Sequence, residues 1–72
     1  MELLNEVLFM QTRLFSLFCE RTNIEPQKAD LLFKEFGIWS YIEKCYDTLH
    51  LEGDENIYLD IINILRSKKV NV

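Results

Sequence analysis

Glycine, proline and histidine are scarce in this 72-residue sequence, and each shortage argues against a class of function. Two glycines, Gly37 and Gly53, are too few and too far apart for a glycine-rich loop that cradles phosphates. The single histidine, His50, is one possible base, whereas zinc sites need several close-set ligands and nucleophilic catalysis needs a base beside its nucleophile. The sequence therefore predicts no catalytic residue, no metal and no cofactor, so we do not expect an enzyme.

Positive charge and paired cysteines are also in short supply. Eight Lys and Arg residues against twelve Asp and Glu residues leave a net charge of −4, which opposes binding to phosphate backbones. Nucleic acid is therefore an unfavourable partner. Cys19 and Cys45 lack the CxxC spacing of metal and redox sites and fall on apolar helical positions, which favours buried, reduced thiols over a disulfide.

No hydrophobic run is long enough to suggest a membrane segment. Polar residues interrupt the apolar N-terminal stretch before it could span a bilayer: Asn5, Glu6, Gln11 and Arg13. The chain opens with Glu2 instead of the basic region of a signal peptide, so we expect no membrane association and a cytoplasmic location. No repeat, low-complexity tract or linker divides the chain, so residues 1–72 should form a single helical domain.

Hydrophobic residues at helical spacing are what the sequence does contain. They predict a compact all-α bundle of about four short helices, without a sheet, because no window alternates apolar and polar residues with period two. In the first helix, about Glu2 to Arg21, an apolar arc of roughly 200° that includes Leu4 and Leu8 indicates the central helix of the bundle. Gln11 lies inside this arc although it is polar.

Proline, glycine and capping residues indicate where the other helices begin and end. Pro26 is suited to begin the second helix, and Gly37 to end it in the left-handed conformation. The third helix is expected over about 38–46, crossing the others steeply, with a loop at 47–53. Asp54 is a plausible N-cap for the fourth helix, and the tail 70–72 is expected to fray.

Three large apolar side chains point away from the main stripes of their helices. Phe9 projects into the polar face of the first helix, Leu31 lies off the apolar face of the second, and Leu59 lies outside the stripe of the last. Apolar residues make up 49% of the chain, more than a monomer of this length needs. We therefore predict that Phe9, Leu31 and Leu59 contact a partner, which is another protein or a second copy in a homodimer.

A helix-turn-helix DNA-binding regulator is the alternative hypothesis. The second and third helices, joined at Gly37, have a spacing that permits this motif. The candidate recognition helix, residues 38–46, contains a single cation, Lys44, which is little for contact with bases and phosphates.

A further pattern spans most of the chain. Its residues are Val7-Leu8-Phe9, Phe18-Cys19-Glu20, Gly37-Ile38, Tyr41-Ile42, Tyr46-Asp47-Thr48-Leu49-His50, Gly53 and Asp60-Ile61. In these residues the chain resembles DUF family 3791, a small bacterial family of unknown function. The resemblance implies a small helical protein encoded beside an ADP-ribosyltransferase-like protein, in an arrangement similar to a toxin–antitoxin pair, with this chain as the binding partner.

The motif Tyr-Asp-x-Leu-His is the most specific part of the pattern and marks a candidate loop: Tyr46, Asp47, His50, Gly53 and Asp60. Within it, we expect the His50 ring to bond a backbone carbonyl or a nearby carboxylate such as Asp47, instead of binding a ligand.

Overall fold

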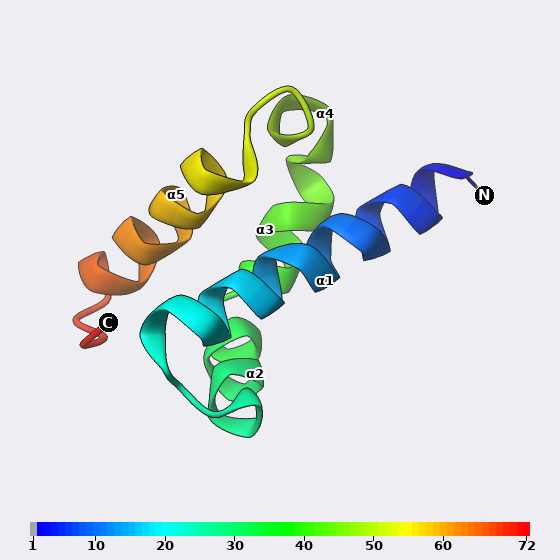
Figure 1. The fold of residues 1–72 in the computed structure, drawn as a ribbon. Coiled ribbons are helices and arrows are strands. Elements are labelled where there is room, and N and C mark those ends of the chain that lie inside the picture. The colour runs from blue at the N-terminus through cyan, green and yellow to red at the C-terminus, as the bar shows by residue number, and fades with distance from the viewer. Residues whose placement is uncertain (1) are drawn as a thin grey trace.

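The computed structural model describes residues 2–72, with side chains from Leu4 onward, and within that range all regular secondary structure is helical (Figure 1). Its five helices are α1 (Glu2–Thr22), α2 (Pro26–Glu35), α3 (Ile38–Lys44), α4 (Tyr46–Leu49) and α5 (Asp54–Ser67). The predicted all-α bundle is confirmed. The additional element is α4, a single helical turn where the sequence predicts the start of a loop.

Cys45 explains the extra turn. It ends α3 with its N–H donating to the Tyr41 carbonyl, and its own carbonyl accepts the Leu49 N–H at 2.8 Å to begin α4. One residue thus closes one helix and opens the next. Hydrophobic spacing does not reveal this break, because Leu49 continues the apolar face and is buried in the core.

Pro26 and Gly37 behave as predicted. Pro26 is the first residue of α2, where the missing N–H has no cost. Gly37 adopts φ +68° directly after α2, and the N–H groups of Phe36 and Gly37 donate to the carbonyls of Leu32 and Lys34. The left-handed turn redirects the chain, so that α3 packs against α1.

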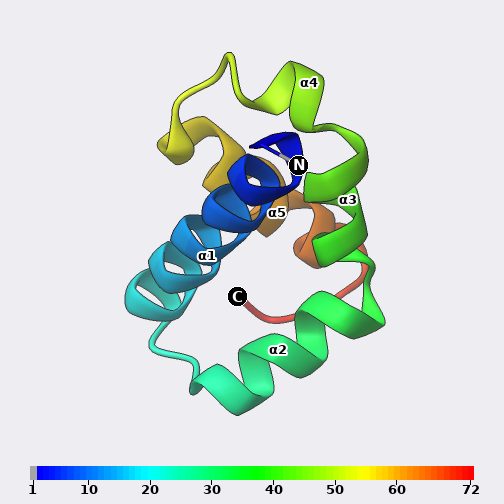
Figure 2. The same cartoon turned by 90° about the vertical axis from the view of Figure 1, so that its right-hand side faces the viewer.

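Helix α1 is the central element. It contacts α2, α3 and α5, as its wide apolar arc predicts. In Figure 2, α3 and α4 lie to the right of α1, α2 lies below it and α5 lies behind. Each of the shorter helices thus meets a different part of the same long helix.

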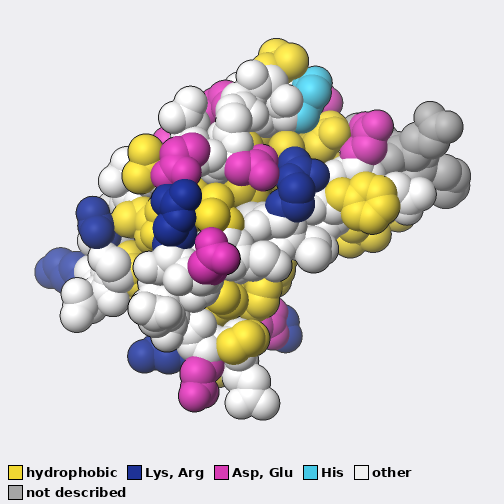
Figure 3. All heavy atoms as spheres, viewed as in Figure 1, with side chains coloured by type: hydrophobic (Ala, Val, Ile, Leu, Met, Phe, Trp, Pro, Cys, Tyr) yellow, Lys and Arg dark blue, Asp and Glu magenta, His cyan; other side chains and the backbone are white. Residues whose placement is uncertain are grey.

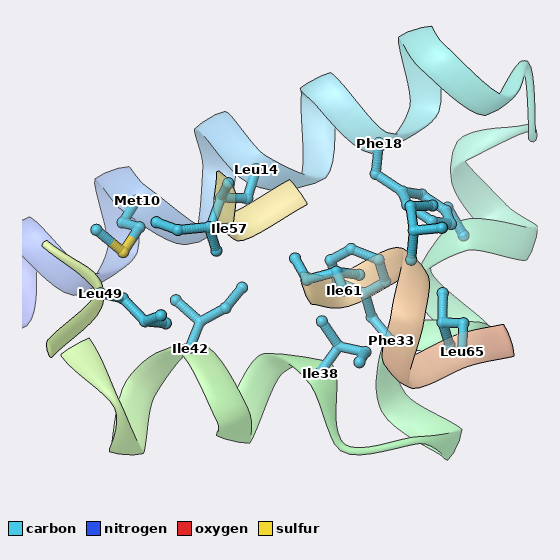
Figure 4. Close-up of a cluster of buried hydrophobic side chains, with 12 residues drawn as sticks. Met10, Leu14, Phe18, Phe33, Ile38, Ile42, Leu49, Ile57, Ile61 and Leu65 are labelled. Atoms are coloured by element: carbon cyan, nitrogen blue, oxygen red, sulfur yellow. The ribbon is translucent and has the colours of Figure 1, made fainter. Parts of the chain in front are cut away.

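The core combines residues from all five helices: Met10, Leu14, Phe18, Ala29, Phe33, Ile38, Ile42, Leu49, Ile57, Ile61, Ile62 and Leu65. Figure 4 shows these side chains pointing toward one another between α1 and α3. Every buried side chain from residue 4 onward is apolar. Hydrophobic burial, which contributes about 1.5–3 kcal/mol for a large apolar side chain, therefore dominates the packing energy.

An aromatic cluster joins the C-terminal half of α1 to α2 and α3. The Phe33 ring meets the Phe18 and Trp39 rings edge-on at centroid distances of 5.1 and 4.9 Å, and Phe15 stacks on Trp39 at 5.2 Å. The Gln11 amide donates to the Trp39 carbonyl oxygen at 3.0 Å. This hydrogen bond explains why a polar residue occupies the apolar arc of α1.

The N-terminal part of α1 differs from the prediction. Leu4 and Leu8 belong to the apolar arc in the sequence, yet both are exposed. Figure 1 shows that α1 extends beyond α3 at this end, where α4 is the remaining neighbour and its Tyr46 bonds Glu6. The thiols are free, as predicted, but Cys19 and Cys45 are half-buried where the sequence predicts burial.

Two arginines of α1 pair with the first two residues of α5. Arg13 donates to Asp54 at 3.1 and 3.4 Å, and Arg21 donates to Glu55 at 2.8 and 2.7 Å. The prediction that Asp54 caps α5 is wrong, because Gly53 is the N-cap and makes no side-chain cap. The Asp54 carboxylate remains in the first turn, where the helix dipole favours negative charge, and bonds Arg13.

The C-terminal tail is also not frayed. Lys69 adopts φ +66°, and the N–H groups of Lys69 and Val70 donate to the carbonyls of Arg66 and Leu65, an arrangement known as a Schellman motif. The turn folds the chain back, so Val70 and Val72 pack against the core. The predicted loose tail is therefore wrong for Val70–Val72.

Replacing Gly37 with alanine should destabilise the protein by about 1 kcal/mol, because a side chain at positive φ is strained. The added Cβ meets no atom within 4 Å, so crowding does not contribute. Gly53→Ala is the matched control: its φ of −78° suits any residue and its Cβ site is equally open. Urea unfolding should show Gly53→Ala within about 0.5 kcal/mol of the parent. If both variants lost the same free energy of unfolding, a conformational role for Gly37 would be contradicted.

Acid should weaken the connection between α1 and α5. The hydrogen bonds from Arg21 hold the pKa of the Glu55 carboxyl below its usual range. The pair therefore stabilises the fold above the unfolded-state pKa of Glu55, near 4.5, and this contribution is lost as pH falls through the folded pKa. Glu55→Gln should lower the melting temperature at pH 7, and this difference from the parent should shrink as the pH falls below about 4.5, whereas Glu43→Gln, at an exposed carboxylate of α3, should have little effect at either pH.

Candidate functional site

A surface pocket of about 270 Å³ lies between the N-terminal half of α1 and α4. We call it the Phe9 pocket, and its lining residues are Glu6, Phe9, Met10, Arg13, Tyr46, His50 and Glu52. It unites one predicted contact residue, Phe9, with two residues of the Tyr-Asp-x-Leu-His motif, Tyr46 and His50. A second hollow, of about 420 Å³, shares Arg13 and lies where α1 meets the start of α5.

The single turn of α4 forms one wall of the pocket. Tyr46 and His50 are four residues apart, so their rings lie one above the other, with centroids 5.0 Å apart and planes inclined by 14°. The His50 ring also lies with Nδ1 2.8 Å from the Tyr46 carbonyl oxygen. Of the two partners considered for His50, the structure shows the backbone carbonyl and not Asp47.

Tyr46 connects this wall to α1. Its hydroxyl donates to Glu6 Oε2 at 3.2 Å. Burial raises the pKa of the Tyr46 hydroxyl, and the Glu6 carboxylate raises it further, so the hydroxyl remains protonated and available as a donor at neutral pH. The aromatic wall is thus held by one bond within α4 and one bond across to α1.

Phe9 stands at the exposed rim. Its side chain is 65% exposed, while the neighbouring Met10 is buried and forms the base of the pocket. Figure 3 shows hydrophobic side chains gathered over the N-terminal half of α1, with the histidine and several carboxylates nearby. The exposure predicted for Phe9 from its place in the polar face is confirmed.

The other predicted contact residues lie elsewhere. Leu31 on α2 and Leu59 on α5 are exposed, as predicted, but neither lines the Phe9 pocket. Sequence reasoning missed Leu51, the most exposed large apolar side chain from residue 4 onward, which follows His50 in the loop. A bulky apolar residue within an otherwise polar loop was the available signal.

Charge in the pocket is mainly negative. Arg13 is the only cation among the described lining residues, and its guanidinium already pairs with Asp54 at 3.1 Å. Glu6 and Glu52 supply carboxylates that this arginine does not neutralise.

The remaining motif residues do not join the pocket. Asp47 is exposed on α4, and Gly53 is the N-cap of α5. Asp60 is half-buried on α5, and its charge raises the pKa of Tyr41 to a smaller extent than burial does. The motif is therefore divided between the pocket wall and the packing of α5.

Other kinds of site find no geometric support in the described chain. No three His, Cys, Asp or Glu side chains within it are placed to hold a metal ion. Burial raises the pKa of the Cys19 thiol, and no hydrogen bond joins Cys45 to His50 between residues 2 and 72. None of the helices in that range has the length and hydrophobicity needed to cross a bilayer.

The surface of α3 offers little for DNA. Helices α2 and α3 are joined through Phe36 and Gly37, but Ile38 and Ile42 of α3 are buried. The exposed residues of α3 are Ser40, Glu43 and Lys44. One carboxylate beside one cation is a poor phosphate-binding surface.

The fold and the pocket define a small all-helical protein whose distinctive feature is an exposed aromatic surface. A family model described as a protein of unknown function, DUF3791, matches residues 9–68, and the chain belongs to this family. The matched region includes Phe9, Tyr46 and His50. No curated protein and no solved structure gives a significant match to the chain.

Proposed function

We propose that this chain is a protein-binding module, without catalytic activity of its own, that contacts another protein through the Phe9 pocket. The observation that carries the proposal is the 65% exposure of Phe9 beside the ordered Tyr46–His50 wall. A large aromatic side chain gains free energy when a partner covers it, and aromatic residues are enriched among the residues that dominate binding energy.

The arrangement favours recognition because its wall is already ordered. Tyr46 and His50 are held by hydrogen bonds to Glu6 and to the α4 backbone. A partner would therefore order few additional side chains, and less binding energy would be lost to conformational entropy. Leu8 on the same helical segment is also exposed.

The family resemblance gives the first partner to test, the ADP-ribosyltransferase-like protein expected to be encoded beside this chain. In that arrangement the chain is the antitoxin-like or regulatory component, and its neighbour is the enzyme. A homodimer that uses the same surface is the competing form of protein binding. The chain's net charge of −4 makes both preferable to a DNA-binding role.

Phe9→Ser should weaken binding to the neighbouring protein about tenfold or more, since removing a central aromatic contact commonly costs over 1 kcal/mol. Leu31→Ser is a matched control, because Leu31 is 64% exposed but lies on α2 outside the pocket. Calorimetric titration should give Kd values, and light scattering after size exclusion should report self-association.

Equal weakening by the two variants would place the contact outside the Phe9 pocket. A parent protein that stays monomeric and binds its neighbour in neither form would remove the proposed function. Both variants should retain the parental melting temperature, since each changes an exposed side chain.

A further inference from the structure

The Phe9 pocket has room for one side chain. Its volume of about 270 Å³ falls below the roughly 300–1,000 Å³ typical of sites for drug-sized molecules. It is also open at the surface, with Phe9 at the rim and Met10 at the base. A protruding side chain of a partner protein therefore fits this space better than a free metabolite does.

The pocket offers unpaired carboxylate oxygens as hydrogen-bond acceptors. Glu6 uses Oε2 to accept the Tyr46 hydroxyl at 3.2 Å, which leaves Oε1 available. Glu52 is exposed at the same pocket. Because ionised carboxylates accept hydrogen bonds and donate none, they complement a donor-rich cation.

The aromatic side chains of the pocket also favour a cation. Phe9 and the stacked Tyr46–His50 pair present ring surfaces beside these carboxylates. The face of an aromatic ring attracts cations, and the planar guanidinium of arginine stacks on such faces while pairing with a carboxylate. The chain already shows this contact elsewhere, where the Arg21 guanidinium lies 5.4 Å from the centre of the Tyr58 ring.

The one cation in the pocket does not reverse this preference. Arg13 already pairs with Asp54, which offsets its charge, whereas the Glu6 and Glu52 carboxylates oppose an acidic side chain at the pocket. A second copy of this chain, with its net charge of −4, would also approach against long-range repulsion.

We propose, building on the protein-binding role above, that the Phe9 pocket receives an arginine side chain from a basic segment of the partner. The guanidinium stacks against Phe9 or the Tyr46–His50 pair and donates to Glu52 and the free oxygen of Glu6. The partner is thus recognised by positive charge and planarity together, and its segment carries arginine at the point of contact.

The test uses the full chain labelled with ¹⁵N and titrated at low salt with arginine amide, lysine amide and norleucine amide. Arginine amide should shift the backbone signals of Phe9, Tyr46 and His50 with an apparent Kd about threefold lower than that of lysine amide, and norleucine amide should bind about tenfold more weakly. Glu52→Gln should weaken arginine amide binding about threefold. Glu43→Gln, which removes the same charge from exposed α3, should leave it unchanged.

Three results would overturn the inference. Equal binding of norleucine and arginine amides would make the pocket an apolar docking site. If Glu52→Gln and Glu43→Gln weakened arginine amide binding equally, the binding would depend on the net charge of the chain and not on the pocket. Pocket signals that shift when the unliganded chain is concentrated would identify a second copy as the occupant. The protein-binding proposal is judged separately, because Phe9→Ser and Leu31→Ser are compared on the partner protein itself and that comparison does not depend on the amide titrations.

Discussion

The apolar face of α1 is the constraint on which the rest of the structure depends. Leu14 and Phe18 on this face are completely buried, and α2, α3 and α5 all pack against α1. Helix α1 has 21 residues, whereas the helices around it have 14 or fewer. In its N-terminal half Leu8 and Phe9 remain exposed. The same helix that organises the core therefore also carries the apolar surface.

The pocket depends on α4, whose two sides have different roles. Leu49 points into the core and fixes the turn, while Tyr46 and His50 form the pocket wall. A turn this short would not be stable in isolation, since helix nucleation is unfavourable. Its order comes from the buried Leu49 and from the Tyr46 bond to Glu6 on α1. Core packing and pocket geometry are consequently linked through this short turn.

Local signals allowed much of the fold to be predicted, and the failures occur where distant residues decide. Pro26 and Gly37 act through their own backbone geometry, so their places at the ends of α2 could be anticipated. The role of Asp54 could not be anticipated, because its carboxylate bonds Arg13 of α1 instead of capping α5. The prediction of a frayed tail failed for the same reason, since the packing of Val70 against the core requires the turn at Lys69 and the completed core. Helical periodicity identified Phe9 as exposed, but its position beside Tyr46 and His50 depends on how α4 crosses α1.

The Phe9 pocket combines a fixed part with an unrestrained part. Tyr46 and His50 have defined hydrogen-bond partners, whereas the Phe9 side chain is 65% exposed to solvent. A fixed wall sets the direction in which a partner's side chain can enter, which favours specificity. An exposed ring at the rim can close over that side chain with a change of rotamer and no movement of the backbone. Because the helices beneath are held by an entirely apolar core, binding at this surface would leave the packing of the bundle unchanged.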